Sequence, residues 1–85
     1  MTCIATCYSH FGAIRFQHLC RDRRWPCRLM PVPRDLSSSC GTCVRYEADG
    51  IPNEQEIPNE VERIVAITPS GYHTLYWAER SQEEL

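Results

Sequence analysis

Residues 2–23 of this 85-residue chain read Thr-Cys-Ile-Ala-Thr-Cys-Tyr-Ser-His-Phe-Gly-Ala-Ile-Arg-Phe-Gln-His-Leu-Cys-Arg-Asp-Arg. Residues 2–8 are uncharged and partly β-branched, which predicts a strand. Ser9 follows where a helix N-cap is expected. Apolar residues then recur at three- and four-residue spacing, which predicts a helix over residues 10–23. The members of this apolar stripe are Ala13, Phe16, Leu19 and Cys20.

The rest of the chain alternates short apolar runs with loops. Three further strands are expected, over Cys27–Met30, Val44–Glu47 and Tyr72–Trp77. Pro31–Arg34 predicts a stiff, extended connector, because proline lacks the amide donor and restricts the preceding residue. Residues 37–43 are expected to form a compact loop or a single helical turn.

Residues 60–67 have two interpretations. Asn59 can cap a short second helix whose first turn carries Glu60 and Glu62. The competing interpretation is a strand over Val61–Thr68. With the helix, the element order β-α-β-β-α-β predicts the α+β class and a ferredoxin-like two-layer sandwich. We expect one domain over residues 1–80 and a frayed tail over residues 81–85.

Composition excludes several classes of function. All nine basic residues are Arg, so Schiff-base chemistry and a Walker-type phosphate loop, which need a lysine, are excluded. No basic run carries interleaved aromatics, so we expect no nucleic-acid binding. No apolar run approaches the roughly 20 residues of a membrane span, and no signal peptide is apparent. We therefore expect a cytoplasmic protein with no membrane contact.

The expected location decides how the six cysteines of the chain are interpreted. In a reducing compartment they are expected to be thiols, metal ligands or redox centres, whereas in a secreted protein they would suggest a disulfide framework. Cys3, Cys7 and Cys20 fit core packing. Cys27 begins the second strand and can approach the later loop.

The loop Ser37-Ser38-Ser39-Cys40-Gly41-Thr42-Cys43 is the candidate site. The hydroxyls and amides of Ser38 and Ser39 can support a thiolate at Cys40, and Gly41 would let the backbone turn closely beside it. A helix N-terminus near Cys40 would favour its thiolate form. A thiolate attacks a sulfane sulfur, a selenium donor or a disulfide.

Charged neighbours and a second thiol complete this candidate site. Arg34, and His10 at the start of the first helix, are candidates to add positive charge beside Cys40. Cys43 stands at the Cys-x-x-Cys spacing that serves both dithiol centres and zinc half-sites. Two functions stay open beside a thiol carrier. One is a zinc or iron–sulfur module with Cys40, Cys43 and Cys27 as ligands, and the other is an interaction domain without chemistry.

Four short motifs resemble the family of small selenium/sulfur carrier-like proteins. They are Ile4-Ala5-Thr6, Ser9-His10-Phe11-Gly12-Ala13, Leu29-Met30-Pro31-Val32-Pro33-Arg34 and Leu36-Ser37-Ser38-Ser39-Cys40-Gly41. The resemblance covers roughly residues 3–47. It implies a small βαβ-type domain that carries sulfur or selenium on Cys40, with Arg34 as the accompanying basic residue.

The expected function is therefore a carrier rather than an enzyme. Cys40 would bear a persulfide or perselenide, and Cys43 would release the cargo by forming a disulfide with Cys40. No cofactor is expected unless the protein is the zinc or iron–sulfur module. The expected partners are a sulfur or selenium donor protein and an acceptor protein, and homodimer formation stays open.

Overall fold

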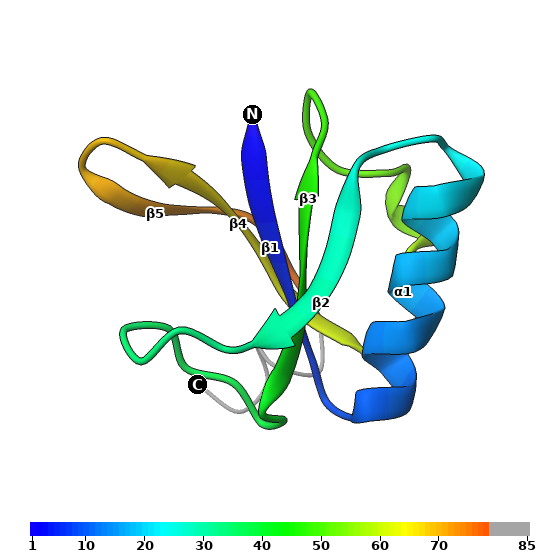
Figure 1. The fold of residues 1–85 in the computed structure, drawn as a ribbon, viewed down its shortest axis with the longest axis horizontal. Coiled ribbons are helices and arrows are strands. Elements are labelled where there is room, and N and C mark those ends of the chain that lie inside the picture. The colour runs from blue at the N-terminus through cyan, green and yellow to red at the C-terminus, as the bar shows by residue number, and fades with distance from the viewer. Residues whose placement is uncertain (79–85) are drawn as a thin grey trace.

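A computed structural model describes residues 1–78 of the chain. One helix and five strands follow one another in these residues, together with a short 3₁₀ turn, η1 (Figure 1). Their bounds are β1 Thr2–Cys7, α1 His10–Asp22, β2 Cys27–Pro31, β3 Thr42–Glu47, η1 Glu54–Glu56, β4 Val61–Thr68 and β5 Gly71–Trp77. The predicted α+β class is confirmed, and the expected tail at 81–85 lies outside the described residues.

The five strands form one antiparallel sheet in the order β2-β3-β1-β4-β5. Strands β1 and β2 both pair with β3, so β1, α1 and β2 make a split β-α-β unit. The ferredoxin-like arrangement expected from the sequence is not confirmed. The described residues add a fifth strand and contain no second α-helix, so one helix faces the sheet.

Val61–Thr68 form strand β4, so the helical interpretation of residues 60–67 is wrong and the competing one is confirmed. Strand β4 pairs with β1 on one side and with β5 on the other. Its side chains are buried on both sheet faces, with Ile64 on one face and Val65 on the other. β-branched residues fit such a position, and two rows of backbone pairing outweigh the local helix-cap signal at Asn59.

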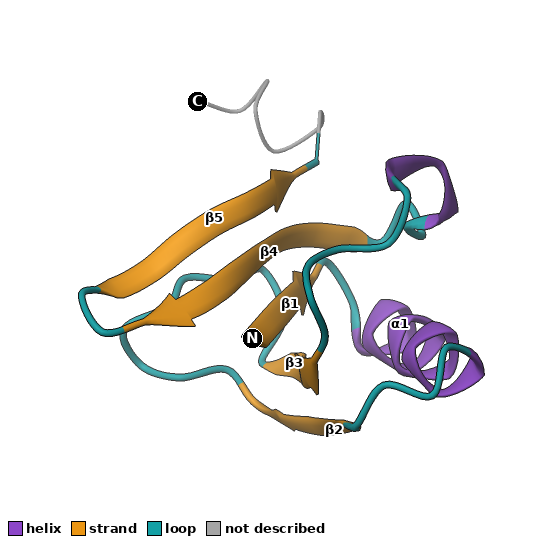
Figure 2. Cartoon of the chain, turned by 90° about the horizontal axis from the view of Figure 1, so that it is seen from above, coloured by secondary structure: helices purple, strands orange, loops and turns teal. Residues whose placement is uncertain are grey.

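Helix α1 covers one face of the sheet (Figure 2). Its N-cap is Ser9, whose Oγ accepts a hydrogen bond from Gly12 N at 3.1 Å. Phe16 packs edge-on to the ring of Tyr46 with centroids 5.4 Å apart, and Trp25 stacks on the other side of that ring at 5.5 Å. This aromatic stack fixes the helix against β3.

The opposite sheet face carries a smaller buried cluster. Its members are Ile4, Leu36, Cys43 and Val65, with Met30, Val32 and Tyr72 packed around them. Leu36 is 5% exposed and comes from the loop between β2 and β3. That loop therefore has a packed anchor on the face that α1 leaves open.

Gly12 sits where helix α1 approaches the segment before β4. A Cβ built there would lie 2.3 Å from Glu60 Cβ, and Glu60 is held by two hydrogen bonds from Arg15. We predict that Gly12→Ala lowers the free energy of unfolding by about 1–3 kcal/mol, because helix and strand must separate. Urea unfolding measures the effect. Gly50→Ala, where a Cβ meets nothing within 4 Å, is the control, and equal effects of the two substitutions would contradict the prediction.

Candidate functional site

Residues 32–41 form an irregular loop between β2 and β3, at the end of the molecule where α1 begins (Figure 1). Of the two forms expected for residues 37–43, a compact loop or a single helical turn, the structure has the loop. Val32 N donates to Gly41 O at 3.0 Å, which closes the loop at its base. Leu36 N donates to Pro33 O at 3.1 Å, and this turn places the Leu36 side chain in the buried cluster. The loop is thus held by its own backbone as well as by burial.

Two side-chain contacts attach the loop to the far strands. Tyr72 of β5 donates its hydroxyl to Asp35 Oδ1 at 2.7 Å. The backbone and hydroxyl of Ser39 donate to the two carboxylate oxygens of Glu62 in β4 at 3.2 and 2.7 Å. The sequence alone does not indicate Asp35, Glu62 and Tyr72, because their partners are 23 to 37 residues away in the chain.

Cys40 is held through its neighbour Ser38. Its backbone N donates to Ser38 Oγ at 3.3 Å, and the same hydroxyl donates to Cys7 O at the end of β1 at 3.4 Å. Cys40 is only partly buried, and it lines a shallow groove of about 420 Å³ together with Arg34 and the three serines. Arg34, Ser38, Ser39 and Cys40, four of the candidate site residues, therefore line the same groove.

Helix α1 begins beside this groove. The ring of His10, its first residue, lies with Nδ1 3.2 Å from the hydroxyl of Thr42, two positions after Cys40. The first turn of α1 carries no acidic residue of its own, and Glu60 packs against it at Gly12. The exposed His10 and the α1 N-terminus thus border the loop that carries Cys40.

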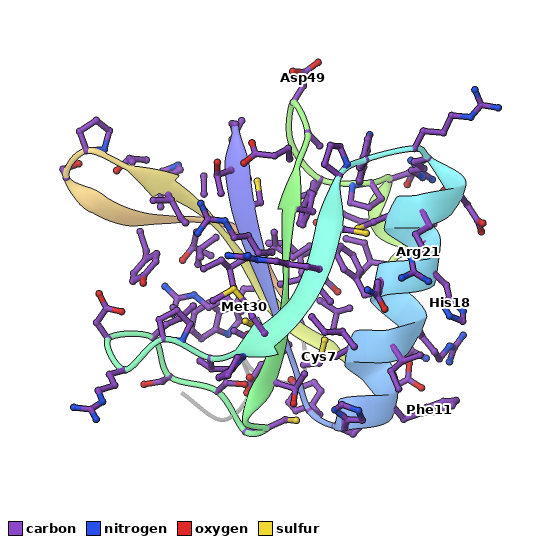
Figure 3. The ribbon with its side chains drawn as sticks, in the orientation of Figure 1. Cys7, Phe11, His18, Arg21, Met30 and Asp49 are labelled. Atoms are coloured by element: carbon purple, nitrogen blue, oxygen red, sulfur yellow. The ribbon has the colours of Figure 1, made fainter. Side chains whose placement is uncertain are left out.

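Two buried thiols lie close enough to Cys40 to interact with it electrostatically. Burial, followed by the charges of Cys40 and Cys43, raises the pKa of Cys7 to about 12. Burial, followed by Cys40, raises the pKa of Cys43 to about 11. Cys43 Sγ donates to Pro31 O at 3.8 Å, and Figure 3 shows Cys7 near the start of α1. Both thiols are therefore protonated at neutral pH. Both are also buried, whereas Cys40 is partly exposed, so Cys40 is the solvent-accessible thiol of the three.

The structure corrects two expectations about the site. A Cβ at Gly41 would meet nothing within 4 Å, and Gly41 lacks a positive φ, so no tight approach requires glycine there. Cys27 does not join Cys40 and Cys43, because its Sγ donates to Gln17 O of helix α1 at 3.8 Å. Within residues 1–78, no three His, Cys, Asp or Glu side chains are placed to hold one metal ion.

Comparison with known proteins assigns the chain to a family. The family described as "Putative Se/S carrier protein-like" matches residues 2–72, which include every strand up to the start of β5, helix α1 and the whole Cys40 loop. The chain belongs to this family. No curated protein and no solved structure matches the chain. Among residues 1–78, no helix is long and apolar enough to cross a membrane.

The burial of the thiols predicts their order of reactivity. At pH 8 we expect iodoacetamide to alkylate Cys40 at least about a hundredfold faster than Cys43 or Cys7. A pKa of about 11 leaves roughly one Cys43 in a thousand as thiolate at that pH. Fragment spectra of the labelled peptides identify the modified residue. In denaturant the difference should disappear, and equal labelling of Cys40 and Cys43 in the folded protein would contradict the prediction.

Proposed function

We propose that this protein carries sulfur or selenium on Cys40. The observation that carries the proposal is the accessible Cys40 thiol, which shares a groove with Arg34 on a loop fixed to three strands. Membership of the selenium/sulfur carrier-like family supports the same role. Because the loop is already fixed, less conformational entropy is lost when a partner protein binds at Cys40.

Loading is a sulfur transfer that conserves electrons. The Cys40 thiolate attacks the outer sulfur of a donor persulfide, forms a new S–S bond and releases the donor as thiolate. Selenium transfers in the same way from a perselenide. Arg34 and the α1 N-terminus supply positive charge at this end of the molecule, which favours the anionic persulfide of Cys40. The two partners in this scheme are a donor protein and an acceptor protein, and the reducing cytoplasm is the setting that keeps six thiols free.

Cys43 is the proposed resolving thiol. Its thiolate would attack the inner sulfur of the Cys40 persulfide, form a Cys40–Cys43 disulfide and release sulfide. The two thiols are oxidised by two electrons while the sulfane sulfur is reduced. Because Cys43 is buried and hydrogen-bonded to Pro31 O, this step requires the thiol to leave that contact and lose its proton.

A mass measurement tests the loading step. After incubation of the reduced protein with a cysteine desulfurase and cysteine, we expect a one-sulfur mass increase that maps to Cys40. Cys40→Ser should abolish it, whereas Cys43→Ala should retain it, since Cys43 is needed only for release. An unmodified wild-type protein, or an undiminished adduct in Cys40→Ser, would refute the proposal.

The pKa of Cys43 predicts the pH dependence of release. Since only the thiolate attacks, sulfide release from loaded protein without reductant should rise about tenfold per pH unit from pH 7 and level off near pH 11. A colorimetric sulfide assay measures the rate. Cys43→Ala should remove this pH-dependent release. A rate that is flat over pH 7–10, or unchanged in Cys43→Ala, would show that Cys43 is not the resolving thiol.

A further inference from the structure

A second pair of thiols lies away from the Cys40 loop, between the end of α1 and the start of β2. Cys20 and Cys27 share a side-chain hydrogen bond. Cys27 Sγ also donates to Gln17 O at 3.8 Å, so its sulfur lies against the last turns of the helix. Neither thiol has a part in the proposed carrier chemistry.

The turn between α1 and β2 holds this pair together. The carbonyl of Cys20 accepts hydrogen bonds from Arg23 N at 3.1 Å and from Trp25 N at 2.9 Å. Arg24 has a φ of 61°, a left-handed conformation that a non-glycine residue adopts only when its surroundings impose it. The short connection is therefore fixed, and it returns the chain so that Cys27 meets Cys20.

The two thiols differ in access. Cys20 is fully buried, and burial followed by the neighbouring Cys27 raises the pKa of Cys20 to about 12. Cys27 is partly exposed, so an external reagent meets it first. Such an arrangement, an accessible thiol in hydrogen-bond contact with a buried one, is suited to attack by the first and resolution by the second.

A groove beside Cys27 carries charges of both signs. Cys27 lines this groove of about 240 Å³ with Arg28, Arg45 and Glu47. Arg28 and Arg45 are paired across β2 and β3, on the sheet face opposite the one where Cys27 packs. Within residues 1–78 neither arginine forms an ion pair or a side-chain hydrogen bond. The groove therefore gives a small molecule access to the chain at Cys27.

We propose that Cys20 and Cys27 form a second thiol–disulfide site that is oxidised by a low-molecular-weight disulfide. Cys27 as thiolate attacks the disulfide and releases one thiolate, which leaves a mixed disulfide on Cys27. The Cys20 thiol then loses its proton, attacks Cys27 Sγ and releases the second thiolate. Two protein thiols are oxidised by two electrons, and the external disulfide is reduced to two thiols. The site is independent of the Cys40 function.

Tryptic mapping of the intact protein tests the site. Trypsin places Cys20 in residues 16–21, Cys27 in residues 25–28, and Cys40 with Cys43 in residues 35–45. After native incubation with glutathione disulfide, we expect peptide 16–21 linked to peptide 25–28. Cys27→Ser should lose the link, and Cys20→Ala should accumulate glutathione on Cys27. Two results for the wild-type protein would overturn the proposal. One is glutathione that remains attached to Cys27, and the other is that Cys20 and Cys27 both stay as free thiols.

A variant of the other site tests whether the two sites are independent. Cys40→Ser should form the 16–21 to 25–28 link at the wild-type rate, even if carrier activity fails. Loss of the link in Cys40→Ser would overturn the independence of the site.

Discussion

The fold depends on the backbone pairing of β1 with β3 on one side and β4 on the other. This central strand is buried on both faces, so a slip of one residue would exchange its two faces. Its C-terminal residue, Cys7, marks the point where four segments meet. The chain turns there into α1, β4 begins opposite it, and its carbonyl accepts the Ser38 hydroxyl that braces Cys40. Register at the centre of the sheet therefore sets the position of the accessible thiol.

Much of this arrangement could be predicted from sequence because its signals are local. The N-cap at Ser9 and the apolar stripe beginning at Ala13 predict α1 to within one residue. The prolines and serines between β2 and β3 mark the loop of Cys40. Whether residues 60–67 form a helix or a strand is not determined by the neighbouring residues in the sequence. It depends on partners in β1 and β5 that no cap signal at Asn59 reveals.

The same limit applies inside the candidate site. The loop composition indicated a presented thiol, but nothing near Cys40 in sequence points to Glu62 or Tyr72, which hold the loop from β4 and β5. Cys7 fits core packing by its strand pattern, and it is indeed buried. Its interaction with Cys40 arises only because β1 ends beneath the loop. A local pattern therefore identified the accessible thiol, while the contacts that hold its loop came from the sheet.

The structure separates the six thiols by environment rather than by sequence spacing. Cys27 lies four positions before Pro31 on β2, about 13 Å along the strand from the base of the Cys40 loop. Each end of the sheet thus holds one accessible thiol beside a buried one whose pKa is raised. A buried thiol resists deprotonation, so it protects its accessible neighbour from spontaneous pairing at neutral pH. This difference in burial is what would allow the two proposed thiol sites to coexist in one small domain.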